Sequence, residues 1–352
     1  MQMRDFVVRF AGEGGQGVVT SAEGLAQTST QAGYHALTFA TFPSQILGGP
    51  TWTQARISVN EVLSPGDDVD VLVAFNQEAY DTHHEDVRPE GVVIFNSNEF
   101  QLEGDSRGFG LPVEDLAKAT GNNRAANMVI IGALAHLVHM PQEFLEEFVT
   151  QRFTRGRAGD DQIISSNIAA LTSGREHIAA SGLSLGDLAP PTRPDWQQVM
   201  LKGNEAVSLG SLAAGLEIYA GYPISPATTI LLFMERNLVG PGKFAYQVSS
   251  EIESITTLLG AGFAGKKAMT ATAGPGFSLM SEGLGLGWIA EIPLVVVNVQ
   301  RGGPATGLPT KTEQSDLMAC MYPAHGDVKM PIIAVGTVEE CFFGAIKAIE
   351  WA

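Results

Sequence analysis

The sequence predicts an α/β protein with two doubly wound, mostly parallel sheets. Short runs of β-branched residues alternate with helical segments, a pattern typical of parallel strands covered by helices on both faces. The length of 352 residues suits two domains of ordinary size. Residues 182–196 contain several prolines and no periodicity, so we interpret this part of the chain as the break between the two domains.

The first domain is expected at residues 1–185, followed by a linker at 186–196. Its opening strand, at residues 5–10, runs directly into the glycine-rich loop GEGGQG and a helix from Val18 to Ala32. Apolar runs rich in β-branched residues predict further strands at 34–41, 69–75 and 91–96. Apolar and amphipathic stretches predict helices at 127–138 and 143–153.

The second domain is expected at residues 197–352. Its expected strands are residues 244–250, 267–272, 293–300 and 331–336. Its expected helices are residues 203–220, 228–238, 251–264, 281–289 and 338–352. A turn is expected at 221–226 and a loop at 273–278. An α/β unit that closes on a helix often needs one more strand to return to its sheet, so truncation at the C-terminus is one interpretation of this ending.

Composition excludes several classes of function. The 21 Lys and Arg residues against 38 Asp and Glu residues give a net charge of −17, which disfavours nucleic acid and anionic membranes as partners. Neither the two cysteines, Cys320 and Cys341, nor the histidines have a metal-binding spacing, so no metal site is expected in this chain. No apolar run reaches ~18 residues and the N-terminus does not resemble a signal peptide, so we expect a cytoplasmic protein.

The first glycine-rich loop contains Gly12, Gly14 and Gly17 in the spacing G-x-G-x-x-G, after a strand and before a helix. A dinucleotide site of this kind needs an acidic residue at the end of the second strand, and none is present there, which disfavours NAD and FAD. Two interpretations stay open besides that one. The loop is a tight turn without a ligand, or its helix N-terminus binds another phosphate-bearing ligand.

Four motifs in the second domain lie near the C-terminal ends of expected strands, the edge at which open α/β sheets bind ligands. They are YPISP at 222–226, SSEIE at 249–253, TAGPGFS at 272–278 and QRGGPATGLPTKTEQSD at 300–316.

Together these motifs resemble the α subunit of the 2-oxoacid:ferredoxin oxidoreductases, with the γ domain of that family fused ahead of it. The segments GEGGQGV, FPSQILGGPTWTQARIS and NMVIIGAL resemble the γ domain. The chain from about Trp196 onward resembles the pyrimidine-type thiamine diphosphate domain of the α subunit. Within the family, the fused layout is most similar to the α subunits of 2-oxoglutarate synthase.

The resemblance implies an enzyme that oxidises 2-oxoglutarate with CoA, releases CO2 and passes electrons to ferredoxin, or that runs in reverse and fixes CO2. It implies thiamine diphosphate shared with a β subunit, which carries Mg2+ and a [4Fe–4S] cluster in an α2β2 assembly. This chain has no GDG motif and no cysteine set of its own, so it should be inactive alone. The alternatives are a pyruvate-type member, a non-catalytic assembly subunit and an NAD-binding dehydrogenase.

The resemblance assigns the catalytic acid to Glu251, the first residue of the expected helix at 251–264. Its carboxyl group would contact N1′ of the aminopyrimidine and take part in proton transfer. Glu253, two positions further on, is the second candidate. The alternative for Glu251 is an ordinary acidic residue favoured by the helix dipole.

Substrate contacts are assigned to Ser225 and Arg301. Ser225 stands where the family usually has Thr in Y-P-I-T-P, and its hydroxyl would contact the carboxylate or keto group of the substrate. Arg301 would bind the carboxylate through two N–H groups. Lys311 and Thr312 would support the same pocket. The alternatives are a turn residue between two prolines for Ser225 and a structural ion pair for Arg301.

The remaining assignments concern the cofactor and CoA. Backbone and apolar contacts to the aminopyrimidine would come from Tyr222, Pro223 and Ile224, and close backbone approach from Gly274 and Gly276. The γ-like loop would lie near CoA through Gly14, Gly15, Gln16 and Gly17. Leu47 replaces an arginine that the family often has, so any contact made by that arginine would be lost here.

Overall fold

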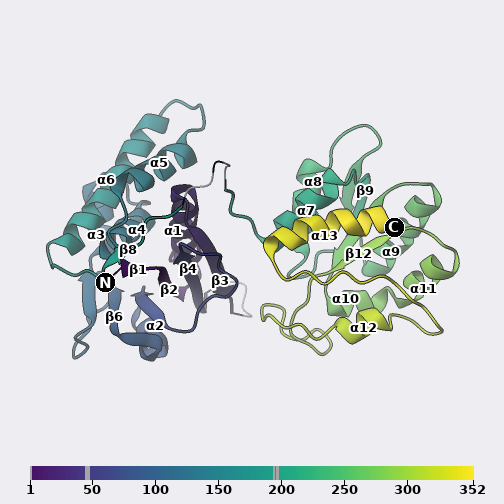
Figure 1. Ribbon diagram of the computed structural model, residues 1–352, viewed down its shortest axis with the longest axis horizontal. Coiled ribbons are helices and arrows are strands. Elements are labelled where there is room, and N and C mark those ends of the chain that lie inside the picture. The colour runs from purple at the N-terminus through teal and green to yellow at the C-terminus, as the bar shows by residue number, and fades with distance from the viewer. Residues whose placement is uncertain (1, 44–47, 193–194, 196–197) are drawn as a thin grey trace. The chain divides into compact units, whose positions relative to one another are not determined.

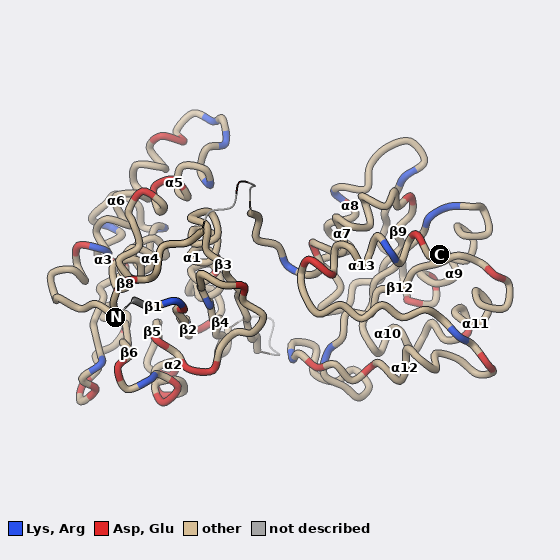
Figure 2. Tube along the Cα trace, viewed as in Figure 1, with Lys and Arg blue, Asp and Glu red and all other residues tan. Residues whose placement is uncertain are grey.

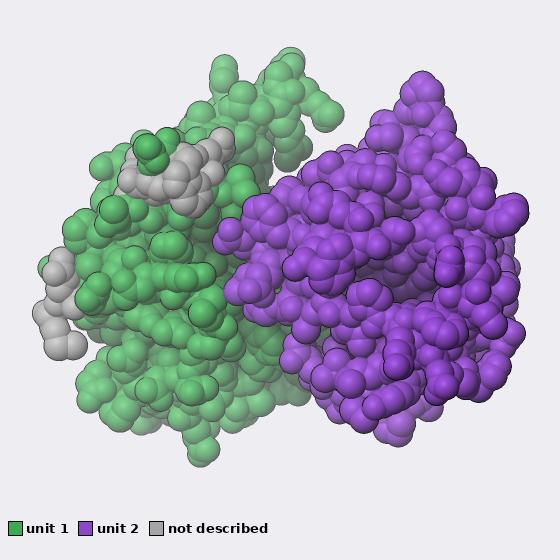
Figure 3. All heavy atoms as spheres, turned by 45° about the vertical axis from the view of Figure 1, so that its right-hand side comes forward, with its two compact units in different colours: residues 1–200 green, residues 201–352 purple. Residues whose placement is uncertain are grey.

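A computed structural model describes residues 2–43, 48–192, 195 and 198–352. The chain forms two compact units, residues 1–200 and 201–352 (Figure 3). Both units are α/β, so the fold class predicted from the sequence is confirmed (Figure 1).

The first unit contains a mixed sheet of six strands in the order β3-β4-β2-β5-β6-β7. The strands are β2 (Asp5–Glu13), β3 (His35–Thr41), β4 (Pro50–Ser58), β5 (Val69–Ala74), β6 (Val87–Asn96) and β7 (Gly108–Leu111). From β2 to β7 the neighbours are parallel, whereas β4 runs antiparallel to both β2 and β3. The sequence did not predict β4, which lies in the sheet between the first two expected strands, β2 and β3.

Helices cover both faces of this sheet. They are α1 (Val18–Ala32), α2 (Gln77–His83), α3 (Val113–Ala119), α4 (Ala126–Leu137), α5 (Gln142–Phe153) and α6 (Asp160–Ala179). Side chains of α1 and α4 pack in one core cluster with β2 and β5, and Ala79 of α2 packs on the opposite face. Helices α4 and α6 touch through their backbones, because a β-carbon on Gly132 would lie 2.0 Å from the carbonyl oxygen of Leu171.

The start of the expected linker is tied to the first unit. Strand β8 (Asp187–Leu188) pairs in parallel with β1 (Gln2–Met3), next to the N-terminus. Linker positions 193, 194 and Trp196, and residue 197 after them, lie outside the described residues.

The second unit contains a four-stranded parallel sheet in the order β10-β9-β11-β12. The strands are β9 (Ile218–Gly221), β10 (Phe244–Gln247), β11 (Ala268–Thr272) and β12 (Val295–Asn298). The helices are α7 (Gly203–Ala213), α8 (Thr228–Asn237), α9 (Glu251–Phe263), α10 (Gly274–Leu279), α11 (Ser281–Ile289), α12 (Leu317–Met321) and α13 (Val338–Trp351). Residues of α8 and α13 form the core on one face, and residues of α9 form it on the other.

Three expectations for the second unit were wrong. The helix expected at 203–220 ends at Ala213, because Gly215 adopts a left-handed conformation (φ 81°) that terminates helices, and β9 follows. The loop expected at 273–278 contains the short helix α10, in which Pro275 occupies the first turn, a position that favours proline. Residues 331–336 form no strand, because this segment does not pair with β12, and residues 331–335 line a cavity beside that strand instead.

Candidate functional site

The four motifs of the second unit meet at one edge of its sheet. Residues 222–226 follow β9, residues 249–253 follow β10, residues 273–278 follow β11, and residues 300–316 follow β12. Because all four strands are parallel, their C-terminal ends lie on the same side. The structure therefore brings together segments that are far apart in the sequence.

Glu251 is a buried carboxylic acid at this edge. It is the first residue of α9, and only 5% of its surface is exposed. A β-carbon on Gly276 would lie 2.4 Å from Glu251 Oε1 and 2.1 Å from Thr272 Oγ1, so only glycine fits there without displacing the acid. Within the described part of the chain, no hydrogen bond or ion pair is made to the Glu251 carboxyl. The site thus holds a sequestered carboxyl with free hydrogen-bonding capacity.

Glu253, the second candidate, has a different environment. Its exposed carboxylate accepts hydrogen bonds from the backbone N–H of Ser249 (2.8 Å) and from its hydroxyl (2.6 Å). These two bonds lower the pKa of Glu253. The N–H of Glu253 in turn donates to the Ser250 hydroxyl at 3.2 Å, which caps α9. Glu253 therefore stabilises the helix start and leaves Glu251 as the acid at the sheet edge.

Arg301 is buried behind the YPISP turn, with 7% of its surface exposed. One terminal nitrogen donates to the carbonyl oxygen of Ser225 at 2.7 Å, and the other donates to the carbonyl oxygen of Thr306 at 2.8 Å. Its Nε–H has no hydrogen-bond partner among the described residues. The structure thus brings Arg301 and Ser225 together, but through the backbone of Ser225.

The other expected residues around this site differ in exposure. Tyr222 is 37% exposed, whereas Pro223 and Ile224 are half-buried and Ile224 packs against the core below β9. The side chains of Lys311 and Thr312 are exposed, and Lys311 holds its loop through its carbonyl oxygen, which accepts from the N–H of Gly302 at 2.9 Å.

Two residues at the site received no role from the sequence. Thr272 ends β11 beside Glu251, and Asp316 lies against Gly274 at the start of α10. Asp316 was part of the motif at 300–316, but spacing along a chain does not reveal which turn of another segment it contacts.

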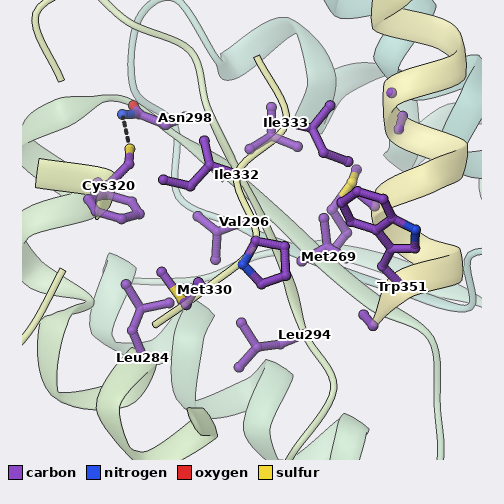
Figure 4. Close-up of a pocket in the computed structure, with 18 of the residues that line it drawn as sticks. Met269, Leu284, Leu294, Val296, Asn298, Cys320, Met330, Ile332, Ile333 and Trp351 are labelled. Carbon is purple, nitrogen blue, oxygen red and sulfur yellow. Dashed lines mark hydrogen bonds between the residues drawn. The ribbon is translucent and has the colours of Figure 1, made fainter. Parts of the chain in front are cut away.

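The second unit also contains a cavity of about 520 Å³ (Figure 4). Its walls are mostly apolar and come from β12, residues 329–335 and α13. Val296, Ile332 and Ile333 point into it in Figure 4. Neither Glu251 nor Arg301 lines this space, although Phe277 and Gln300 of the motifs do.

The glycine-rich loop of the first unit is a closed turn. The Gln16 side chain accepts from the backbone N–H of Glu13 at 2.7 Å, which folds the glutamine back into the loop. Gly17 adopts φ 90° at the start of α1, and a β-carbon there would lie 2.4 Å from Asn127 Oδ1. Gly14 and Gly15 are exposed at the tip. Leu47 lies outside the described residues.

Acidic side chains occur on both units (Figure 2). Over the residues that the structure describes, no three His, Cys, Asp or Glu side chains converge on a point that could hold a metal ion. The helices in the described ranges are too short or too polar to cross a lipid bilayer.

Two family models match this chain, one in each unit. The pyruvate ferredoxin/flavodoxin oxidoreductase model matches residues 7–177. The thiamine diphosphate-binding model of pyruvate flavodoxin/ferredoxin oxidoreductases matches residues 209–352.

Individual proteins agree with these matches. The 2-oxoglutarate oxidoreductase subunit KorA of Mycobacterium tuberculosis is 32% identical over 393 residues, which cover 100% of this chain and 59% of that protein. The 2-oxoglutarate synthase subunit KorA of Methanocaldococcus jannaschii is 45% identical over 152 residues, covering 43% of this chain and 42% of that protein.

A solved structure is similar over nearly the whole chain. It is the 2-oxoglutarate:ferredoxin oxidoreductase from Magnetococcus marinus with 2-oxoglutarate, coenzyme A and succinyl-CoA bound. The TM-score is 0.90 and the identity 36%, over 99% of this chain and 61% of that one. The chain therefore spans about three fifths of the length of this protein and of the mycobacterial relative.

Proposed function

Because the chain belongs to the 2-oxoacid:ferredoxin oxidoreductase family, we propose that it supplies the aminopyrimidine half of a thiamine diphosphate site that oxidises 2-oxoglutarate with CoA. The observation that carries this proposal is the buried carboxyl of Glu251, which has no partner within the described chain and lies against Gly276. An unpaired acid is costly to bury in a structural role and useful in proton transfer.

The residues at the sheet edge fit the aminopyrimidine ring. Glu251 has free capacity for one hydrogen bond to a ring nitrogen, and Gly274 and Gly276, which have no side chains, let Asp316 and Glu251 lie against the backbone of α10. Tyr222, Pro223 and the half-buried Ile224 offer apolar and backbone contacts on the neighbouring strand end. When bound, thiamine diphosphate supplies the electron sink for decarboxylation. Glu251 holds the proton that the ring nitrogen exchanges, in a setting with little water.

Arg301 and Ser225 would bind the substrate. The exposed Ser225 hydroxyl is free to donate to a carboxylate or keto oxygen. The positively charged Arg301 guanidinium lies buried beside Ser225, and its two terminal nitrogens already donate to two carbonyl oxygens. The Nε–H has no partner among the described residues, so this group and the second N–H of a terminal nitrogen remain available for a two-pronged bond to the carboxylate. Lys311 and Thr312 would contribute from the adjacent exposed loop.

A β subunit would cover this edge of the sheet and carry the diphosphate, Mg2+ and the [4Fe–4S] cluster that reduces ferredoxin, in an α2β2 assembly. Large apolar side chains on the helices beside Glu251 support a covering partner. Ile252 of α9 is 54% exposed, Leu279 of α10 is 53% exposed and Met318 of α12 is 62% exposed. Apolar side chains gathered on a surface commonly mark a protein interface.

CoA would bind at the glycine-rich loop of the first unit. The exposed Gly15 and the left-handed Gly17 that opens α1 present N–H groups suited to a phosphate, whereas the N–H of Gly14 donates to the carbonyl oxygen of Gly49 at 3.4 Å. Gln16 supports the turn from inside, since its carboxamide oxygen is bonded to the N–H of Glu13.

Reconstitution tests this function. The chain is co-expressed with its β partner, and CoA-dependent reduction of a viologen is measured with 2-oxoglutarate and with pyruvate. We expect turnover with 2-oxoglutarate, none without CoA and none from this chain alone. A complex that contains the iron–sulfur cluster yet binds no thiamine diphosphate would contradict the proposal, and a preference for pyruvate would change only its substrate.

A further inference from the structure

Helix α10 lies between two carboxylic acids that come from different parts of the chain. Glu251 contacts its third residue, Gly276. Asp316 contacts its first residue, because a β-carbon on Gly274 would lie 2.7 Å and 2.9 Å from the two carboxylate oxygens of Asp316. A displacement of α10 at Gly274 therefore changes the space available to the Glu251 side chain.

Asp316 is itself held by the end of β12. Its Oδ2 accepts a hydrogen bond from Asn298 Nδ2 at 3.2 Å, and its backbone N–H donates to Gln300 Oε1 at 2.9 Å. Asn298 also contacts Cys320 Sγ at 3.6 Å, the contact drawn in Figure 4, and the N–H of Cys320 donates to the carbonyl oxygen of Asp316 at 2.9 Å. The half-buried Asp316 is thus fixed to the sheet through side-chain and backbone bonds.

Helix α10 needs such an external contact. It has six residues, and a helix this short is not stable by its own hydrogen bonds. Pro275 in its first turn has no N–H, and a carboxylate beside the N-terminal turn is favoured by the helix dipole. Asp316 provides that carboxylate from a position anchored on β12.

We propose that Asp316 is a positioning residue, which fixes α10 through Gly274 and thereby sets the position of the Glu251 carboxyl. The effect on Glu251 rests on the proposed role of this residue in thiamine chemistry. The fixing of α10 by Asp316 is a property of the chain alone. Asp316 acts by contact and does not touch a reacting atom.

Hydrogen–deuterium exchange of the purified chain tests the anchor without cofactor or partner. In Asp316→Ala, we expect the amides of Gly274 and residues 276–279 to exchange about tenfold faster, while those of α8 are unchanged. Asp327→Ala is the matched control, since Asp327 is an exposed acid on a nearby loop, and it should leave both rates unchanged. Unchanged exchange of α10 in Asp316→Ala would overturn the proposal.

A pair of substitutions in the reconstituted enzyme tests the consequence for Glu251. Gly274→Ala places a methyl group against the Asp316 carboxylate and should lower kcat, while the KM for 2-oxoglutarate changes little. Asp316→Ala should also lower kcat by about tenfold, and the double variant should be no worse than Asp316→Ala, because the clash is gone. Additive losses would overturn the contact mechanism. Absence of wild-type turnover would count against the proposed function instead and leave the exchange result standing.

Discussion

The carboxyl of Glu251 lies so close to Gly276 that a β-carbon on Gly276 would be 2.4 Å from Oε1. The acid begins α9 and the glycine lies in α10, and the two helices follow different strands of the same sheet. The site therefore depends on how β10 and β11 place the starts of their helices. Four of the following predictions concern that edge or the glycine-rich loop, and one concerns the stability of the first unit.

Replacement of Glu251 by Gln should remove catalysis without unfolding the chain. The amide keeps the size of the side chain but does not exchange a proton, so kcat should fall by about 10²–10⁴-fold. Turnover of the reconstituted enzyme and the thermal unfolding midpoint are measured together. Glu253→Gln is the control, because the exposed Glu253 carboxylate only accepts hydrogen bonds from Ser249 at the start of α9, and it should keep most of the activity. Equal losses in both variants would contradict our choice of acid.

Gly276→Ala should weaken thiamine diphosphate binding and lower kcat together. The added methyl group meets both Thr272 Oγ1 and Glu251 Oε1 at well below contact distance. Gly260→Ala, in the exposed part of α9 with open space around it, is the matched control and should be neutral or stabilising by up to about 1 kcal/mol. Calorimetric titration of the complex with thiamine diphosphate measures the effect, and wild-type affinity in Gly276→Ala would show that the contact is not part of the site.

Arg301→Lys should raise the KM for 2-oxoglutarate and destabilise the second unit. Lysine has one nitrogen where arginine reaches the carbonyl oxygens of both Ser225 and Thr306, so one of these two oxygens loses its donor. The expected loss in unfolding free energy is about 1–3 kcal/mol. Urea unfolding and steady-state kinetics are compared with Arg236→Lys on the exposed face of α8, which should change neither. A loss of stability with an unchanged KM would assign Arg301 a purely structural role.

The stabilisation that Asp105 gives the first unit should be lost at low pH. Hydrogen bonds from the Arg107 side chain are the main cause that lowers the pKa of Asp105 from 3.8 to about 2. Its stabilising contribution is complete above the unfolded pKa and is lost as the pH falls through the folded one.

Asp105→Asn should therefore reduce the unfolding free energy by about 2 kcal/mol at pH 7 and by roughly half as much at pH 3. Urea unfolding followed by circular dichroism at pH 7, 4 and 3 measures the difference. Asp68→Asn, an exposed acid of the same unit, should show no such trend. A difference that stays constant with pH would argue against the Asp105–Arg107 pair as its cause.

Gly17→Ala should destabilise the glycine-rich loop and weaken CoA binding. Alanine is strained at φ 90°, and its β-carbon would meet Asn127 Oδ1 at 2.4 Å. Gly104→Ala has the same kind of strain at φ 85° but open space around it, so it controls for backbone strain alone. CoA binding to the purified chain is measured by calorimetry. If both variants bind CoA with wild-type affinity, CoA binding does not depend on this loop.

The four motifs of the second unit and the γ-like segments of the first predicted the family, and the alternation of β-branched runs with helical segments predicted the α/β fold; both are confirmed. The reason is local. β-branched runs such as residues 293–300 form strands where a parallel sheet can pair with them, and motifs that follow parallel strands must meet at one edge. The glycines at 274 and 276 were likewise recognised as places of close backbone approach before their neighbours were known.

Burial and long-range pairing were decided only in three dimensions. Spacing alone did not separate Glu251 from Glu253, because both lie in the first turn of α9, whereas the fold buries one and leaves the other bonded to Ser249 at the surface. The same holds for β4, whose place depends on partners on both sides, and for residues 331–336, which have strand composition but no pairing partner. Composition sets what a segment can form, and the neighbours brought to it by the rest of the chain set what it does form.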